Sequence, residues 1–505
     1  MNLGQTLRDS AAATPGRIAV ALGDQTVTYG DLDGRVDAAA WALQQVGVGP
    51  GDRVAVMMGN RVPFVVAFYA TLRAGGTVVP VNTSLTAGEV GDQLSDSGAA
   101  VMIVGRAYAA VVAELRGTLP HLAHVFVTDS VPTVDPGEGM ASWPQRIADA
   151  AGRHPDEPTM DEGHLAVLAY TSGTSGQPKG AMLTHGQLLA NHAQLTASGA
   201  GVADGDIVLC ALPLFHIYGL NVAMAMTLAN GGTLELVERF DPVSTLQLIQ
   251  RRAVTVIVGA PPMYVAWLNT PGSEEIDLGS VRLATSGAAP LPGKILTRCA
   301  QDLGLDIRQG YGLTEAAPVV TTSAGLPQAR PGSVGRALEG VMIKIMDEDI
   351  QAEPGDPGRV LVKGANVFSG YFQKPEDTAE VLRDGWLETG DIGYLDDDEL
   401  YLIDRLSDLI IVSGFNVYPV EVEAALMSHP AVMAAAVIGV PHPYTGEAVK
   451  AVVVAAPGAE LTADELIGYS ASRLARFKRP ETVEFVSELP TLPTGKLRRR
   501  LLRDG

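Results

Sequence analysis

The segment 170–180 has the composition of a loop that binds phosphate. Its sequence, YTSGTSGQPKG, places three glycines and four Ser or Thr hydroxyls in eleven positions. A glycine-rich backbone can turn several N–H groups toward anionic oxygens, and Lys179 adds a positive charge. The same composition also suits a plain turn between a strand at 165–170 and a helix from about Thr184. Taken alone, the segment leaves both interpretations open.

The position of the lysine disfavours the commonest nucleotide loop. In the motif G-x-x-x-x-G-K-[ST] the lysine directly follows a glycine and opens a helix. Here Gln177 and Pro178 lie between Gly176 and Lys179. Proline removes one backbone donor and restricts the preceding residue to extended conformations, so the lysine is predicted on a stiff, non-helical segment. A P-loop kinase or ATPase is therefore not expected.

Other short motifs carry residues that could act on a nucleotide or an acid. They are LPLFHIYG at 212–219, SGAAP at 286–290, QGYGLTE at 309–315, WLETGD at 386–391, DRLSD at 404–408, SGFNVYP at 413–419 and LPTGK at 492–496. Glu315 offers the hard oxygen that Mg²⁺ prefers. His216 has no His or Cys at metal-ligand spacing, so a structural role competes with a ligand contact. A lysine near a chain end is normally solvated, but the proline and glycine beside Lys496 restrain the backbone that presents it.

In this order, the motifs from Tyr170 to Lys496 resemble those of the adenylate-forming superfamily, which contains acyl-CoA synthetases, adenylation domains of nonribosomal peptide synthetases and firefly luciferase. The resemblance implies ATP, Mg²⁺ and coenzyme A as ligands. It assigns ATP binding to Thr171, Ser172, Gly173, Thr174, Lys179, Gly287, Ala288, Ala289, Gln309, Gly310, Tyr311, Asp391 and Arg405. It assigns catalysis to Thr314, Glu315 and Lys496, and the metal ion to Thr171 and Glu315. It assigns the acid to His216, Tyr218 and Gly312, and coenzyme A to Gly414, Phe415 and Lys478.

The chain departs from these relatives at the hinge. The position two residues after Arg405 usually holds Asp or Lys, and here it is Ser407, with Asp408 beside it. The resemblance implies that the C-terminal residues rotate about this point. One site would then meet Lys496 in the first step and the Gly414 segment in the second. The substitution leaves open which residue carries the rotation.

The resemblance implies an enzyme, an AMP-forming acid–CoA ligase. A carboxylate and MgATP would give acyl-AMP and pyrophosphate, and a thiol would then displace AMP. The motif YGLTEAAPVV favours a medium- or long-chain fatty acid. The segments KGANVFSGYF and SGFNVYP also resemble malonyl-CoA synthetases, and Arg282 could receive a second carboxylate or be an ordinary surface arginine. The motifs are also compatible with an enzyme that loads an acyl carrier protein, with a luciferase-type oxygenase and with a non-enzymatic ATP-binding relative.

Alternating apolar strands and helices are expected to position these motifs. Strands are predicted at 53–58, 77–82, 100–105 and 124–129, and again at 165–170, 207–212, 233–237 and 255–259. Thr86 with Glu89 forms a capping box, and Asp241 before Pro242 marks a helix start. Residues 130–160 are predicted as a connecting loop. The fold class is therefore α/β, with two βα-layered subdomains.

The pattern changes in the last third of the chain. Glycine-punctuated β segments at 341–346 and 358–362 predict a small β-barrel appended to the α/β body. Beyond residue 405, strands at 432–440 and 449–455 and a second capping box, Thr462 with Glu465, predict a small mobile α+β domain. The expected domains are an adenylation domain, 1–404, with the ATP and acyl site, and a mobile domain, 405–505, with the hinge, the CoA segment and Lys496.

Composition limits the protein class and the partners. The 505 residues are 47% hydrophobic and 18% charged, as in globular proteins, and the net charge of −21 disfavours nucleic-acid binding. The longest apolar runs, such as 431–440, are shorter than the ~20 residues that span a bilayer. The first residues show no secretory signal, and Cys210 and Cys299 are expected to be buried thiols. A cytoplasmic protein without an integral membrane segment is predicted, acting on a carboxylic acid, ATP and coenzyme A.

Overall fold

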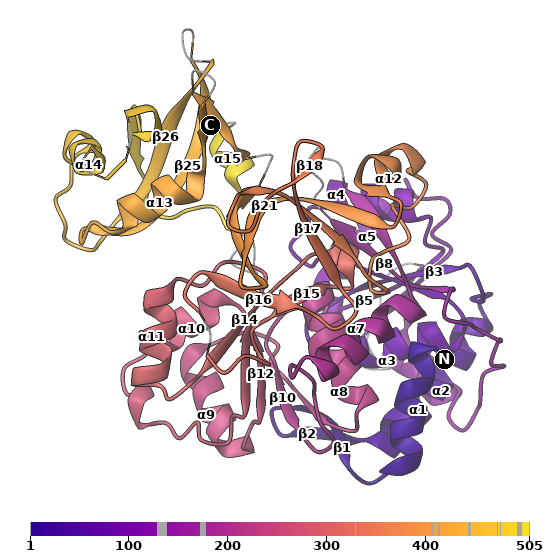
Figure 1. The fold of residues 1–505 in the computed structure, drawn as a ribbon. Helices are drawn as coiled ribbons and strands as arrows, with labels where there is room; N and C mark the ends of the chain where they lie inside the picture. Colours follow the sequence, from indigo (N-terminus) through magenta and orange to yellow (C-terminus); the bar gives the residue numbers. More distant parts are fainter. Residues whose placement is uncertain are drawn as a thin grey trace. The chain divides into compact units, whose positions relative to one another are not determined.

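The computed structural model describes residues 2–128, 139–171, 178–328, 330–405, 408–412, 415–442, 446–471, 473–474, 476–491 and 497–503. The chain divides into two compact units (Figure 1). The first contains Met1–Pro331, Gly335–Met342 and Lys363–Leu387, and the second contains Gly332–Val334, Ile343–Val362 and Glu388–Gly505. The predicted boundary at 404/405 concerns which part rotates, and it stays a prediction.

The first unit contains a seven-stranded sheet that carries the phosphate-loop segment. Its order is β7 (Ala141–Ser142), β6 (His124–Val127), β5 (Val101–Val104), β3 (Arg53–Met57), β4 (Thr77–Pro80), β8 (Leu165–Thr171) and β9 (Lys179–Thr184). All neighbours are parallel except β8 and β9. The helices that precede or connect its strands are α1 (Leu3–Ala13), α2 (Tyr29–Gln44), α3 (Val62–Arg73), α4 (Ala87–Ser97), η1 (Arg106–Tyr108), α5 (Ala109–Leu115) and α6 (Trp143–Asp149). The predicted capping box of Thr86 and Glu89 begins α4.

The prediction of a plain loop over 130–160 is wrong for its middle part. Strand β7 and helix α6 occupy 141–149. The side chain of Ser142 caps the helix by accepting the N–H of Gln145, and Pro144 lies in its first turn. Trp143 is buried, with its ring 5.3 Å from that of Phe126. One large buried side chain therefore anchors a helix too short to show a clear periodic pattern.

A second sheet of the first unit carries the motifs at 212–219, 286–290 and 309–315 at the ends of its strands β10, β13 and β14. Its order is β15 (Val319–Thr322), β14 (Ile307–Gly312), β13 (Leu283–Ser286), β12 (Val256–Gly259), β10 (Ile207–Cys210), β11 (Thr233–Leu236), β1 (Ile18–Leu22) and β2 (Gln25–Thr28), and β15 also pairs with 336–337 of β16 (Ser333–Ala337). Strands β11, β10, β12, β13 and β14 are parallel neighbours. The carboxyl ends of parallel strands meet at one edge of a sheet, which is where ligands bind in α/β folds.

The helices of this part are α7 (His185–Ala197), a π-helix (Tyr218–Ala225), α8 (Met226–Ala229), α9 (Pro242–Arg252), α10 (Pro261–Leu268), η3 (Ser273–Glu275), α11 (Gly293–Asp302) and η4 (Thr314–Ala316), with α12 (Pro375–Val381) and β20 (Leu382–Arg383) later in the chain. Helices α9, α10 and α11 lie side by side along the sheet (Figure 1). Helix α9 begins at the predicted cap, because the side chain of Asp241 accepts the N–H of Ser244.

The second unit contains two groups of strands. The first is the run β18 (Ile350–Gln351), β17 (Met342–Asp347), β19 (Gly358–Lys363), β21 (Trp386–Asp396) and β22 (Glu399–Arg405). In the described residues this run has a free edge at β18, where Ile350 is 76% exposed, so no closed barrel is shown. The strands expected from the glycine-punctuated pattern are present. Among the described strands they form an open sheet, in which the two-residue edge strand β18 pairs with β17 alone.

The C-terminal part of the second unit is the predicted α+β fold. Its five-stranded sheet contains β23 (Ile410–Val412), β24 (Phe415–Val417), β25 (Val432–His442), β26 (Gly446–Ala455) and β27 (Thr482–Phe485). The helices are α13 (Pro419–Met427), α14 (Ala463–Ser470), η6 (Arg476–Lys478) and α15 (Arg499–Arg503). The capping box of Thr462 and Glu465 begins α14 as predicted. Buried side chains such as Val437, Val449 and Leu466 form its core.

Two expectations from composition can be compared with the fold. Cys210 and Cys299 are both buried and unpaired, as predicted, and burial raises the pKa of each thiol to about 12. Both thiols therefore stay protonated and unreactive near neutral pH. In the part of the chain that the structure describes, every helix is too short or too polar to cross a membrane.

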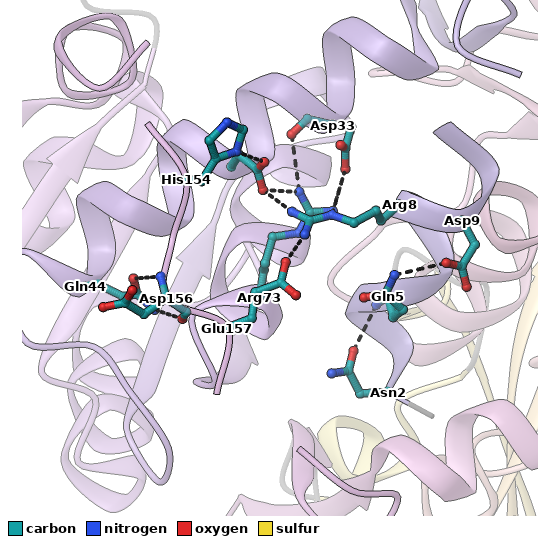
Figure 2. A network of polar contacts seen from close by, with 11 residues as sticks. Asn2, Gln5, Arg8, Asp9, Asp33, Gln44, Arg73, His154, Asp156 and Glu157 are labelled. Carbon is teal, nitrogen blue, oxygen red and sulfur yellow. Dashed lines mark hydrogen bonds and ion pairs between the residues drawn. The ribbon is translucent and has the colours of Figure 1, made fainter. Parts of the chain in front are cut away.

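An ion network with a buried pair at its centre joins the first three helices to the segment that leads into β8 (Figure 2). Arg73 of α3 donates to Asp33 and to Asp37 of α2, both at 2.6 Å, and Arg8 of α1 also pairs with Asp37. The side chains of Arg73 and Asp37 are only 3% and 6% exposed. His154 Nδ1 lies 2.7 Å from the same aspartate. Asp37 is therefore the shared anion of the network.

Asp37→Ala is expected to destabilise the first unit by about 3 kcal/mol, because it removes a buried carboxylate that Arg8 and Arg73 share and leaves the buried Arg73 with only Asp33 as an anionic partner among the described residues. Urea unfolding followed by tryptophan fluorescence measures the change. The matched control is Asp302→Ala, which removes an exposed pair with Arg298 and is expected to cost about 0.5 kcal/mol or less. An equal decrease in the free energy of unfolding in the two variants would show that the buried pair stabilises the fold no more than an exposed pair does.

Candidate active site

The phosphate-loop segment is the connection of a β-hairpin. Thr171, the last residue of β8, is paired with Lys179, the first residue of β9. The predicted strand at 165–170 is therefore confirmed, Lys179 lies on an extended segment as expected, and Thr184 caps helix α7. Strand β9 itself was not predicted. Ser172, Gly173 and Thr174 lie outside the described residues.

Lys179 lies beside two side chains: Tyr371, which precedes α12, and Asp377, which belongs to α12. Its Nζ pairs with the Asp377 carboxylate and lies 5.3 Å from the centroid of the Tyr371 ring. The lysine side chain is only 13% exposed, so its position is fixed by these neighbours. An ammonium group has three donors, and the pair with Asp377 leaves donors for a second anion. The arrangement fits a lysine that contacts a phosphate.

Glu315 is connected to the same cluster through Tyr371. It lies in η4, directly after β14, and is half-buried. The Tyr371 hydroxyl donates to Glu315 Oε1 at 2.8 Å. Burial and the neighbouring carboxylate raise the pKa of Tyr371, so the phenol stays protonated and remains a donor. The structure thus brings together Lys179 and Glu315, two residues that were predicted separately.

The donor set fits a magnesium ion that arrives with a nucleotide. Within the described residues, no group of three or more His, Cys, Asp or Glu side chains forms a metal site. Mg²⁺ bound with ATP takes most of its ligands from phosphates and water, and it needs only one or two protein oxygens. The Glu315 carboxylate and the Thr171 hydroxyl would supply them.

The predicted adenine segment follows β13 at the carboxyl edge of the second sheet. Ser286, the last residue of β13, is paired with Gly259 of β12 and with Gln309 of β14. The segment 286–289 therefore leaves the sheet beside Gln309, whereas 310–312 continues β14 and pairs with β15. Ala288 has φ +68°, a strained conformation for a residue with a side chain, and such strain gathers at functional sites.

Close packing explains why two positions at this edge are glycine. A Cβ at Gly287 would lie 3.1 Å from the Tyr218 ring, so the ring occupies the space that the glycine leaves. A Cβ at Gly312 would lie 2.2 Å from the carbonyl oxygen of Pro318, which only glycine tolerates. Ala288 is exposed and Ala289 half-buried, whereas Gln309 and Tyr311 are buried. Little of the Tyr311 ring is therefore available for stacking in this state.

A narrow apolar cavity begins beside these residues. Tyr218 and Val222 of the π-helix line it together with Gly310 of β14. The other lining residues are Leu195, Ala200, Val202, Val256, Val258, Leu283, Thr285, Val319 and Thr322. The Tyr218 hydroxyl is 2.9 Å from Thr285 Oγ1, and burial raises its pKa to about 12. Of the predicted acid contacts, Tyr218 lines the cavity, and His216 and Gly312 do not.

His216 and Arg282 both have protein partners. His216 is half-buried, and its Nδ1 accepts the N–H of Tyr218 at 3.3 Å. Arg282 precedes β13, at the opposite end from Ser286, and its guanidinium pairs with Asp206 and donates to the carbonyl of Gly201 at 2.9 Å. The structure therefore favours the surface-arginine interpretation of Arg282 over a role in receiving substrate.

Four further predicted site residues belong to the second unit. Asp391 is buried in β21 and paired in register with Arg405 of β22, and its N–H donates to Thr389 Oγ1 at 3.1 Å. Phe415 begins β24. Lys478 Nζ donates to both carboxylate oxygens of Glu421, at 2.7 and 2.6 Å. Ser407, Gly414 and Lys496 lie outside the described residues.

Sequence inspection missed the side chains that organise the site. Tyr371, Asp377 and Val222 were not proposed, although Tyr371 stands in the quoted segment KGANVFSGYF. The feature of the sequence that could have indicated Tyr371 is that it directly follows Gly370. The backbone of Gly370 has φ +117°, and a Cβ there would lie 2.6 Å from the Thr378 side chain, so this turn requires glycine.

Comparisons with known proteins agree with this arrangement. The AMP-binding enzyme family matches residues 7–372, and the AMP-binding enzyme C-terminal domain matches residues 421–496. The chain is 37% identical to the long-chain-fatty-acid–CoA ligase of Bacillus subtilis (strain 168), over 99% of this chain and 94% of that protein. It is 38% identical to the feruloyl-CoA synthase of Amycolatopsis sp, over 96% and 95%. ATP-bound MatB from Rhodopseudomonas palustris matches with a TM-score of 0.91 and 33% identity, over 100% and 99%. The chain therefore belongs to the AMP-binding enzyme family, within the adenylate-forming superfamily, and is of the acyl-CoA synthetase type predicted from its motifs.

Proposed function

We propose that this protein activates a medium- or long-chain fatty acid with MgATP and transfers the acyl group from acyl-AMP to coenzyme A. The observation that carries the choice of acid is the cavity between Tyr218 and Gly310, which has no charged side chain in its lining. Each buried methylene contributes about 0.8 kcal/mol, whereas an unpaired buried carboxylate is costly. The lining therefore suits an acyl chain better than the second carboxylate of a diacid, and the cavity, with a volume of about 20 Å³, would have to widen to admit the chain.

The chemistry follows from the positions of the charged groups. A carboxylate is a poor electrophile, and its attack on ATP brings two anions together. Lys179 and the backbone of the hairpin connection would bind phosphate, and Glu315 with Thr171 would hold Mg²⁺. The ion, when bound with ATP, supplies further shielding of phosphate charge. Lys496 would stabilise the α-phosphate during adenylation, and no side-chain nucleophile is needed.

The second half-reaction needs a different set of groups at the same place. Gly414, Phe415 and Lys478 are proposed to receive coenzyme A. The residues 405–505 would rotate about Ser407 to exchange Lys496 for this segment. Glu421 holds Lys478 in the present state, so a phosphate of coenzyme A would compete with that carboxylate.

The test is thioester formation by the purified full chain, followed by mass spectrometry. The assay contains MgATP, coenzyme A and one acid at a time: acetate, malonate, C6 to C18 fatty acids, or ferulate. A preferred fatty chain supports the proposal, and preference for malonate or ferulate overturns the choice of acid. Accumulation of acyl-AMP without a CoA thioester would indicate a carrier protein as acceptor. Absence of both products would leave a non-enzymatic ATP-binding role.

Val222→Phe is expected to move the chain-length preference toward shorter acids, because the larger ring fills the cavity one turn beyond Tyr218. Each methylene that no longer fits should cost roughly fourfold in kcat/KM. The measurement is kcat/KM across C6 to C18 acids. Val243→Phe, at a 48% exposed position on α9, is the matched control and should keep the wild-type profile. Parallel profiles for all three proteins would place the acyl chain elsewhere.

A further inference from the structure

The backbone that follows Glu315 is held by three completely buried asparagines. Asn221 of the π-helix donates to the carbonyl of Ala317 at 2.7 Å. Asn191 of α7 donates to the carbonyl of Val319 at 2.8 Å and accepts its N–H at 3.2 Å. Asn366 donates to the carbonyls of Ala316 and Val319, at 2.8 and 3.0 Å. Two helices and the turn that contains Asn366 thus fix one stretch of four residues, 316–319.

These amides are themselves oriented by other buried side chains. His192 Nε2 lies 2.9 Å from Asn221 Oδ1. Gln194 donates to Asn366 Oδ1 at 3.3 Å and accepts from Asn191 at 3.4 Å. A buried network whose members are satisfied holds a unique geometry, because any other arrangement leaves polar groups unpaired. The stretch 316–319 therefore has little freedom to shift.

The segment 366–371 extends this frame to the side chain of Glu315. The N–H of Phe368 donates to the carbonyl of Glu315 at 2.8 Å. The Tyr371 hydroxyl donates to its Oε1, also at 2.8 Å. Tyr371 is itself fixed, since its N–H donates to Thr378 Oγ1 at 2.8 Å and its ring packs edge-on against Phe368 at 5.0 Å. Within the described residues, Oε2 of Glu315 has no hydrogen-bond donor.

We propose that Tyr371 is a positioning residue for the MgATP site: its hydroxyl occupies one oxygen of Glu315, and the asparagine frame fixes the backbone, so that the other oxygen is presented to the cation that ATP brings. This inference rests on the proposed function, because it takes Glu315 as a magnesium ligand. Removing a side chain that hydrogen-bonds to a metal ligand, without touching the metal itself, commonly lowers metal affinity or activity by 10- to 100-fold. Tyr371 contacts Glu315, the proposed metal ligand, and is not proposed to contact ATP or the reacting acid.

The test compares Tyr371→Phe with the wild-type full chain by calorimetric titration of ATP, once with Mg²⁺ and once with EDTA. We expect about tenfold weaker binding of MgATP, and unchanged binding of ATP in EDTA. The half-saturating Mg²⁺ concentration for pyrophosphate exchange should rise as well. An unchanged MgATP affinity in Tyr371→Phe, with a wild type that does depend on Mg²⁺, would overturn the inference.

Two further variants separate positioning from general stability. Tyr29→Phe removes another buried hydroxyl, which donates to the carbonyl of Gly232 at 2.7 Å and contacts none of the residues proposed to bind MgATP, so it should leave MgATP binding unchanged. If Tyr371 acts through Glu315, the double variant Tyr371→Phe/Glu315→Gln should bind MgATP about as weakly as Glu315→Gln alone. If the two residues act independently, the fold-losses of MgATP affinity in the single variants would multiply in the double variant, and that result would contradict the inference. A wild type that binds ATP equally with and without Mg²⁺ would overturn the metal assignment itself, and the inference with it.

Discussion

Glu315→Gln is expected to lower MgATP-dependent pyrophosphate exchange by roughly 10²- to 10³-fold, the loss typical of removing one preorganised electrostatic group. The amide keeps the size of the side chain and can still accept from Tyr371. It lacks the negative charge that a hard cation prefers. The fold around it should survive, because the bonds of 316–319 come from the asparagine side chains and not from the Glu315 carboxylate.

The measurement is the exchange of labelled pyrophosphate into ATP in the presence of the preferred acid, at several Mg²⁺ concentrations. Glu275→Gln, an exposed position in η3, is the matched control and should behave as wild type. If the loss comes from weakened metal binding, excess Mg²⁺ should restore part of the rate. A variant within about threefold of wild type would remove Glu315 from the metal site.

The sequence predicted the parts of the site that are local. The spacing of Pro178 and Lys179 indicated an extended lysine, and Lys179 begins strand β9. The capping boxes at Thr86 and Thr462 begin α4 and α14. Each of these signals involves residues only a few positions apart. Such residues favour one local backbone conformation, whatever the rest of the chain does. The order of the motifs then predicted the family, which the comparisons confirm.

What the sequence did not reveal depends on contacts between distant residues. The frame around 316–319 combines Asn191, Asn221 and Asn366, and a single asparagine in a sequence has no pattern that predicts burial. The partner of Lys179 is Asp377, almost two hundred residues later. The role of Arg282 also stayed open until its pair with Asp206 was visible. These interactions are set by the packing of two sheets, which periodicity does not encode.

The catalytic assignment of Lys496 still depends on the sequence, since this residue lies outside the described part of the chain. Its motif, LPTGK, stands at the end of the matched C-terminal family region, 421–496. The restraint from proline and the bend allowed by glycine are the physical reasons to expect a presented lysine. Separate measurement of the two half-reactions can test this expectation directly.

Lys496→Ala is expected to reduce acyl-AMP formation by roughly 10²- to 10³-fold, because the α-phosphate loses its positive partner as the carboxylate attacks. ATP binding should persist, since Lys179 and the hairpin connection remain. Thioester formation from supplied acyl-AMP and coenzyme A should stay within a few-fold of wild type, because that step has no incoming carboxylate. Lys294→Ala, an exposed lysine on α11, is the control. Equal losses in both half-reactions would indicate damage to the fold, and normal adenylation would assign the charge stabilisation to another group.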